Sequence, residues 1–258
     1  MVTEFLVARD VSFLYTTWRE TPLAPVLAHF TLTLTEGEFF CLLGPSGCGK
    51  TTVLNLMAGF LAPTVGTLTL AGRPIHGPGV DRAVVFQSDD ALFTWLRTID
   101  NVAFGLRMRG LSQERRYAIA REYLHLVHLD GQEHKYPSEL SGGMKQRVQI
   151  ARVLANDPQI LLMDEPFGAL DAQTRTRLQD ELVEIWRQTR KTILFITHDI
   201  AEAVLLADRV GVMTCGPGAR MHTIISVDLP RPRRRSSPGF GEMWEQLNTL
   251  IESTEADQ

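Results

Sequence analysis

The chain has 258 residues, of which 44% are hydrophobic and 22% charged, a composition typical of a soluble globular protein with one large domain or two lobes. Its formal net charge of −4 gives no reason to expect a nucleic-acid partner, because phosphate backbones attract basic surfaces. The apolar runs are strand-length, far short of the roughly 20 residues that span a bilayer, and the N-terminus makes a poor secretory signal, so a role at a membrane requires a partner.

Short β-rich segments alternate with helical patterns along the chain, which predicts a parallel sheet flanked by helices. The expected buried strands are Phe39–Leu43, Ala83–Phe86, Ile160–Met163, Leu194–Thr197 and Val210–Met213. A helical pattern over Lys50–Phe60 follows the first of them. Polar and apolar residues alternate instead in Thr31–Thr35 and Thr67–Leu70, which indicates an antiparallel sheet with one solvated face.

Between Ser88 and Leu140 the β pattern disappears and helical periodicity takes over. We therefore expect one domain over residues 1–229 with a helical subdomain at about 88–156, and a C-terminal tail over 230–258. The basic, proline-rich stretch from Pro230 to Pro238 is typical of a solvated linker, although its arginines could instead contact anionic lipid headgroups. The apolar stripe after it predicts a short amphipathic helix.

A glycine-rich segment between the first buried strand and the next helix matches the pattern GxxxxGK[ST]. Its residues are Gly44, Pro45, Ser46, Gly47, Cys48, Gly49, Lys50 and Thr51, and Thr52 follows them. Glycines let the backbone curl around phosphates with its N–H groups pointing inward, and the helix N-terminus adds partial positive charge. We expect Lys50 to reach the β- and γ-phosphates and Thr51 to offer its hydroxyl to Mg²⁺. The segment therefore predicts a nucleoside triphosphate site.

The three cysteines, Cys41, Cys48 and Cys215, form no CxxC pair, which argues against a disulfide framework and favours a reducing cytosol. Cys48 lies inside the glycine-rich segment. Its side chain either faces away from the nucleotide, or its thiol has a pKa lowered by the helix N-terminus and blocks ATP binding when alkylated.

Polar residues end several of the expected strands. Asp164 and Glu165 follow Ile160–Met163, and we expect Asp164 to hold Mg²⁺ and Glu165 to orient and deprotonate the attacking water. His198 could hydrogen-bond the γ-phosphate, and Gln87 could offer its amide oxygen to Mg²⁺ or to the water. Taken singly, each of these residues could equally be an incidental polar residue at a strand end.

The run from Leu140 to Val148 resembles the signature of ATP-binding-cassette (ABC) ATPases. The other motifs also follow the order of that family, with Gln87 before the signature and Asp164–Glu165, Gly168–Asp171 and His198 after it. The resemblance implies an α/β P-loop NTPase fold with a parallel core sheet, an antiparallel β subdomain and an inserted α-helical subdomain. It also implies two cassettes paired head to tail around two ATP molecules.

The signature opens a helix, whose N-terminus offers another anion site. In such a pair it lies too far from the phosphate loop of its own chain, so we expect it to complete the ATP site of the second copy. The residues concerned are Ser141, Gly142, Gly143 and Met144. Met144 replaces the glutamine that is commonest in the family, and we expect little effect on ATP binding. Tyr15 matches in placement the aromatic residue that stacks on adenine.

A narrower likeness, over motifs such as Gly77–Arg82, Asn101–Gly105 and Cys215–Gly218, is to the ATPase subunits of bacterial importers for nitrate, taurine and other sulfonates. It implies a homodimer or a pair with a close relative, bound to transmembrane permease subunits at the cytoplasmic face of the inner membrane, with a solute-binding protein outside. Two alternatives are a soluble ABC ATPase acting on nucleic acid or ribosomes, and the ATPase subunit of an exporter. The former usually carries two cassettes or a coiled-coil insertion, and neither pattern is seen in this sequence.

Four large apolar residues follow Gln87 in a stretch that reads as a loop. They are Leu92, Phe93, Trp95 and Leu96. Either they form the core of the helical subdomain, or they line a partly exposed groove that receives a short helix of the permease.

Overall fold

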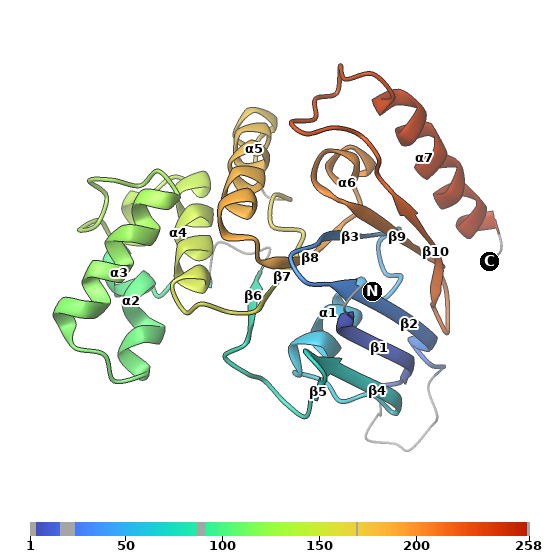
Figure 1. The fold of residues 1–258 in the computed structure, drawn as a ribbon, viewed down its shortest axis with the longest axis horizontal. Helices are drawn as coiled ribbons and strands as arrows, with labels where there is room; N and C mark the ends of the chain where they lie inside the picture. The colour runs from blue at the N-terminus through green and yellow to red at the C-terminus, as the bar shows by residue number, and fades with distance from the viewer. Residues whose placement is uncertain (1–3, 16–23, 87–90, 169, 257–258) are drawn as a thin grey trace. The chain divides into compact units, whose positions relative to one another are not determined.

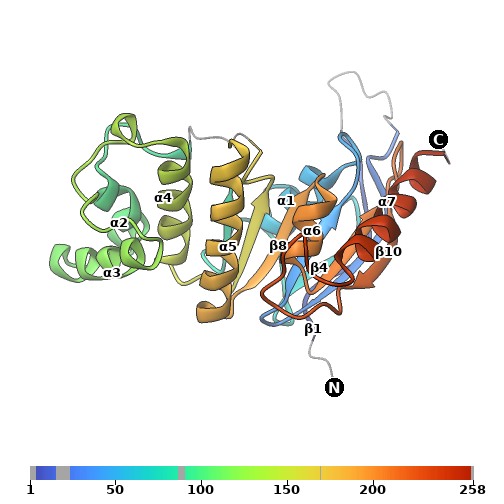
Figure 2. The same ribbon diagram turned by 90° about the horizontal axis from the view of Figure 1, so that it is seen from above.

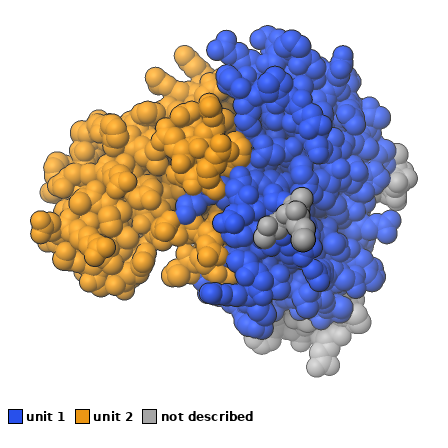
Figure 3. Space-filling view, viewed as in Figure 1, with its two compact units in different colours: residues 1–79, 191–258 blue, residues 80–190 orange. Residues whose placement is uncertain are grey.

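The computed structural model describes residues 4–15, 24–86, 91–168 and 170–256. The chain forms two compact units (Figure 3), one made of residues 1–79 with 191–258 and the other of residues 80–190. The second unit is thus one continuous stretch of chain inserted between the two halves of the first.

The first unit contains two sheets and three helices among its described residues (Figure 1). Its strands are β1 (Glu4–Phe13), β2 (Leu27–Thr35), β3 (Phe39–Leu43), β4 (Val65–Leu70), β5 (Arg73–Pro74), β8 (Thr192–Thr197), β9 (Arg209–Met213) and β10 (Met221–Ser226), and its helices are α1 (Lys50–Ala58), α6 (Ile200–Leu206) and α7 (Phe240–Ala256). One sheet is antiparallel with the order β2-β1-β4-β5. In the other, β10, β9, β3 and β8 are neighbours in that order, with β3 parallel to β8 and β9.

Burial explains why the two sheets have different sequence patterns. All residues of β3 and β8 are buried, as expected for central strands covered on both faces. Buried residues of β2 alternate with more exposed ones, as in a sheet with one solvated face. Both predicted sheets are confirmed. The sequence pattern missed β1, in which Asp10 has a φ of 51° and the pairing register shifts between Ala8 and Val11, so that the alternation is broken.

Helices pack on the parallel strands of the first unit. Helix α6 contacts β3 and β8, and α7 contacts α6 and β9 (Figures 1 and 2). Phe240 and Leu247 are buried residues of α7, as its predicted apolar stripe requires. No helix of the described residues is long and apolar enough to cross a bilayer.

The second unit is mainly helical. Its elements are β6 (Arg82–Val85), α2 (Thr98–Met108), α3 (Gln113–Leu126), a short 3-10 helix η2 (Pro137–Glu139), α4 (Gly142–Leu154), β7 (Ile160–Asp164) and α5 (Ala172–Thr189). Strands β6 and β7 pair in parallel, α2 contacts α3 and α4, and α4 contacts β6 and α5. The side chains of Ser112, Ser141 and Asp171 cap the N-termini of α3, α4 and α5, which explains where these helices begin.

The prediction of a solvated linker over Pro230–Pro238 is wrong at its centre. Arg233 is only 7% exposed, and its guanidinium donates hydrogen bonds to main-chain carbonyls. Arg231 forms an ion pair with Asp208 at 2.9 Å. Both guanidiniums are therefore engaged inside the first unit rather than with lipid headgroups.

Candidate nucleotide-binding site

The glycine-rich segment forms the turn that joins β3 to α1. Gly47 and Gly49 have φ values of 83° and 91°, in the left-handed region that residues with a Cβ rarely adopt. Gly49 is also the N-cap of α1, where no side chain accepts a hydrogen bond from the first turn. The first backbone N–H groups of α1 are thus available for an anion, which is the geometry that binds phosphate.

Lys50 is the buried cation of this turn. It is 5% exposed, and its Nζ donates hydrogen bonds to the carbonyl oxygens of Gly44 at 2.7 Å and Pro45 at 2.8 Å. These bonds hold the ammonium inside the curve of the loop. Carbonyl dipoles offset only part of the cost of burying a charge, so a phosphate is the partner that this arrangement favours.

Tyr15 lies beside the same helix. Its hydroxyl is 3.4 Å from Oγ1 of Thr52, and its ring packs edge-on against Phe13 with centroids 4.8 Å apart. The side chain is 45% exposed, so part of the ring remains open to a ligand. A ring fixed on one edge and exposed elsewhere suits stacking on adenine. Thr51, next to Thr52, is exposed at the start of α1.

His198 is brought to the phosphate loop by strand register. Leu43 of β3 pairs with Thr197 of β8, so Gly44 and His198 leave adjacent parallel strands at the same edge of the sheet. His198 is exposed there. The hydrophobic strands thus place two polar segments together that are far apart in the sequence.

In the second unit, Asp164 is the last residue of β7 and Glu165 follows it. Val85 of β6 pairs with Met163 of β7, so Phe86 and Asp164 come next at the same edge. Glu165 has a φ of 42°, in the left-handed region, which interrupts the strand alternation and turns the chain. Gln87 falls outside the described residues.

The signature lies at the start of α4. The hydroxyl of Ser141 accepts a hydrogen bond from the N–H of Met144 at 3.4 Å, and Gly142 is the first helical residue. A polar cavity of about 690 Å³ opens at this helix end. Its lining residues are Ser141, Gly143, Met144, Arg147, Gln173, Thr174 and Arg177, from α4 and α5. The cavity combines a helix N-terminus with two arginines, which suits an anionic group.

Sequence reasoning missed the basic residues of this cavity. Arg147 makes a two-pronged ion pair with Glu181 of α5, with N–O distances of 2.8 and 2.5 Å. Arg177 lies 3.8 Å from the same carboxylate, at i,i+4 spacing. The i,i+4 spacing of Arg177 and Glu181 is a sequence signal for their ion pair. No local pattern links Arg147 to Glu181, which lies 34 positions away.

Of the two alternatives for Cys48, the one with a lowered thiol pKa is wrong. Burial raises the pKa of the Cys48 thiol and outweighs the opposing effect of Lys50. The side chain is 2% exposed, and its Sγ would lie 2.9 Å from a Cβ at Gly44. The buried thiol is therefore packed against Gly44, where an added Cβ would have to displace it.

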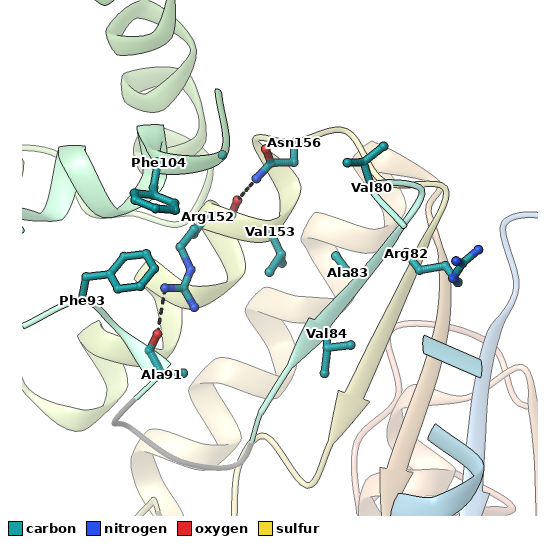
Figure 4. Close-up of a pocket in the computed structure, with 11 residues that line it drawn as sticks. Val80, Arg82, Ala83, Val84, Ala91, Phe93, Phe104, Arg152, Val153 and Asn156 are labelled. Atoms are coloured by element: carbon teal, nitrogen blue, oxygen red, sulfur yellow. Dashed lines mark hydrogen bonds between the residues drawn. The ribbon is translucent and has the colours of Figure 1, made fainter. Parts of the chain in front are cut away.

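A second, apolar cavity of about 330 Å³ lies between α2, α4 and β6 (Figure 4). Phe93 and Phe104 pack with ring centroids 4.5 Å apart on one side, and Val84 lies on the other. Between them, Arg152 donates a hydrogen bond to the carbonyl of Ala91 at 2.8 Å and lies over the Phe93 ring.

The four apolar residues after Gln87, which were predicted to form either core or groove, have different environments. Leu92 is buried and belongs to the core, whereas Phe93 lines the cavity. Trp95 is 72% exposed and packs on Phe93 with ring centroids 5.4 Å apart. Leu96 is half-buried. Leu92 thus fits the core alternative, whereas the groove alternative stays a prediction for Phe93 and Trp95.

A phosphate loop between a buried strand and a helix, with a second helix that opens on Ser-Gly-Gly, defines the class of protein, a P-loop ATP hydrolase of the ABC type. The chain belongs to the ABC transporter family, because the sequence model of that family matches residues 27–168. The predicted α/β fold is that of this family.

The similar proteins include import ATP-binding proteins. The chain is 48% identical over 259 residues to the taurine import ATP-binding protein TauB of Burkholderia pseudomallei, covering 97% of this chain and 98% of that protein. It is 46% identical over 233 residues to the nitrate import ATP-binding protein NrtD of Synechococcus elongatus, covering 89% and 85%. A solved dimeric ATP-binding cassette in a post-hydrolysis state with ADP and Pi matches with a TM-score of 0.72 and 29% identity, covering 86% of this chain and 98% of that one.

Proposed function

We propose that this chain is the ATP-hydrolysing subunit of a bacterial ABC importer that takes up a small solute, namely nitrate, taurine, another sulfonate or a related compound. The observation that carries the proposal is the similarity to a taurine import ATP-binding protein over 97% of the chain. The range of solutes follows from that protein and from the nitrate import relative.

In this proposal the phosphate loop binds ATP and Tyr15 stacks on its adenine. Lys50 meets the β- and γ-phosphates, Glu165 orients and deprotonates the attacking water, and His198 hydrogen-bonds the γ-phosphate. The left-handed backbone at Glu165 supports its role, because strained residues cluster at functional sites.

The residues also fit Mg²⁺. The Thr51 hydroxyl and the Asp164 carboxylate are hard oxygen donors, the type that Mg²⁺ prefers, and Gln87 would add an amide oxygen. The described residues contain no group of three or more His, Cys, Asp or Glu that could hold a metal by themselves. In this proposal the ion would be bound jointly with ATP phosphates, where its charge would offset that of the departing phosphate.

The signature serves the second copy of the chain. Ser141 to Met144 would bind the γ-phosphate of ATP held by the partner cassette, and the polar cavity with its two arginines supports an anionic occupant. A homodimer therefore contains two shared ATP sites. The post-hydrolysis dimer among the similar structures supports this arrangement.

The apolar cavity beside Phe93 would receive a short helix of the permease. The loop that carries Trp95 is fixed by Asn101, whose side chain bonds the main chain of Phe93, Leu96 and Arg97 with distances of 2.9 to 3.2 Å. The exposed indole thus sits on an ordered loop next to an apolar cavity, which suits a docking surface. The chain would work at the cytoplasmic face of the inner membrane, below a permease that receives solute from an external binding protein.

ATP-dependent dimerisation and the role of Glu165 as the base are tested by light scattering of Glu165→Gln with Mg-ATP. The amide keeps the shape of the side chain and removes the base. We expect an ATP-dependent dimer in this variant and only a transient one in the wild type. The control is Glu184→Gln on α5, which changes a half-exposed carboxylate. A monomeric Glu165→Gln protein at saturating ATP would contradict the assignment of Glu165.

Import is tested by reconstituting the chain with a permease and a solute-binding protein, if such a pair is encoded beside the gene. The reconstituted complex should hydrolyse ATP faster when the binding protein carries taurine, nitrate or an alkanesulfonate, and vesicles should accumulate that solute. Stimulation by none of these solutes would reject the proposed solute range, and solute efflux would reject import.

A further inference from the structure

Helix α6 begins two residues after His198, and hydrogen bonds to different segments of the chain hold its two ends. It has seven residues, Ile200–Leu206, which is about 10 Å of helix at 1.5 Å per residue. A helix of two turns moves as one body, so a contact at its C-terminal end also fixes its first turn.

The N-terminal turn of α6 is hydrogen-bonded to the two residues that flank His198, Thr197 and Asp199. The buried Thr197 hydroxyl donates a 2.6 Å hydrogen bond to Glu202 and accepts one of 3.0 Å from the N–H of Asp199. Asp199 in turn caps α6 by accepting from the N–H groups of Ala201 and Glu202. The turn that carries His198 is therefore tied to the first turn of α6.

The other end of α6 is held by the C-terminal tail. Arg233 donates from its Nη1 to the carbonyls of Val204 and Ala207, and from Nε and Nη2 to those of Leu229 and Val227. Arg231 donates a 2.6 Å hydrogen bond to the carbonyl of Leu206 and pairs with Asp208.

This bonding pattern suits the end of a helix. The last carbonyls of α6 lack partners within the helix and carry partial negative charge, and a guanidinium offers five N–H donors to meet them. Arg233 is buried, and desolvation together with repulsion from Arg231 lowers its pKa to about 10. It is therefore still charged at neutral pH, although it sits away from water.

We propose that Arg233, together with Arg231, is a positioning residue for His198, so that the C-terminal tail sets through α6 the orientation in which His198 meets the γ-phosphate. The inference rests on the proposed role of His198. It assigns to residues 230–258 a part in ATP hydrolysis, which the ATP motifs alone do not suggest.

The test is the ATP turnover of Arg233→Met, which removes the donors and keeps an unbranched side chain. We expect kcat to fall about tenfold or more, because small misplacements of catalytic groups are costly, and KM for ATP to change less than twofold, since the phosphate loop is untouched. The matched control is Arg234→Met, one residue along and exposed, with turnover equal to wild type. An unchanged kcat in Arg233→Met would overturn the proposal.

A double-mutant cycle with His198→Ala separates positioning from general destabilisation. Turnover is followed by release of radiolabelled phosphate, so that slow variants can be measured. If the arginine acts through His198, Arg233→Met should lower kcat less than twofold in the His198→Ala background. The same fold loss in both backgrounds would overturn the proposal.

Two further results separate this proposal from the proposed function. Full activity of His198→Ala alone would remove the role of His198, and the positioning proposal with it, and leave the ATPase assignment standing. If Arg233→Met does not fold, Arg231→Met carries the same cycle, because it loses only the bonds to Leu206 and Asp208. Additive losses with Arg231→Met would then reject the proposal.

Discussion

Gly143 of the signature lies against Thr174 of α5 so closely that a Cβ at position 143 would be 2.7 Å from Cγ2 of Thr174. Thr174 is held in turn, because its N–H donates to the N-cap Asp171 at 3.0 Å. The glycine in the signature is thus required by the packing of α4 on α5, in addition to any contact with nucleotide.

Gly143→Ala should therefore destabilise the protein by about 1–3 kcal/mol through overpacking, because a β-branched threonine cannot move aside easily. ATP-dependent dimerisation should weaken as α4 shifts. The double variant with Thr174→Ser, which lacks the clashing methyl, should regain stability. Thermal unfolding measures this, with Gly241→Ala on α7 as control, since a Cβ there meets nothing within 4 Å. Equal stability of Gly143→Ala and wild type would contradict the packing argument.

The Arg147–Glu181 pair should contribute to the stability of the second unit. Both side chains are mostly buried, at 15% and 16% exposed. Glu181→Gln should cost about 1–3 kcal/mol, as for charge-assisted hydrogen bonds, whereas Glu184→Gln on the same helix should cost under about 0.5 kcal/mol. Urea unfolding of the two variants measures the difference, and equal midpoints would show that the pair is not stabilising.

Lys50→Met should strongly weaken ATP binding and keep the fold, since methionine retains the apolar part of a side chain that is 5% exposed. We expect a loss of affinity of about 100-fold or more, because the buried charge that meets the phosphates is gone. Calorimetric titration with Mg-ATP measures it, beside the exposed Lys135→Met as control. Binding within tenfold of wild type would argue against the phosphate-loop assignment.

Trp95→Ala should abolish transport by the assembled importer and leave the ATPase activity of the isolated chain intact, because Trp95 is 72% exposed beside the apolar cavity. Met108→Ala, which changes another exposed apolar residue of the same unit at 63%, is the control and should transport normally. Solute uptake into vesicles measures both. Normal uptake with Trp95→Ala would place the permease contact elsewhere.

Alkylation of Cys48 by iodoacetamide should be slow at neutral pH, because burial raises its pKa above the ordinary value of 9.0 and the thiolate is the reactive form. Because the pKa of Cys48 is raised in the folded state, its neutral thiol contributes to the free energy of unfolding below pH 9.0. This contribution is lost as the pH rises through the raised pKa. Mass spectrometry should find the partly exposed Cys215 modified first and the fully buried Cys41 last. Rapid labelling of Cys48 at pH 7 would contradict the burial.

Local patterns in the sequence were enough to predict the phosphate loop, the strands that end in polar residues and the helix N-terminus at Ser141. Each depends on residues within a few positions of one another, such as the left-handed glycines 47 and 49 before Lys50. The strand β1 was missed because a bulge at Asp10 removes its alternation. The arginines of the tail were misread as solvated, because their composition alone resembles a linker.

By itself, the sequence determined that this protein binds and hydrolyses ATP as an ABC ATPase, because the motifs are short and their chemistry is local. Only the tertiary structure decided which residues support them. Arg147 meets Glu181 across 34 positions and Arg233 meets Val204 across 29. Such pairs follow from the packing of one helix or segment on another, and helix packing is set by the whole core rather than by any local pattern.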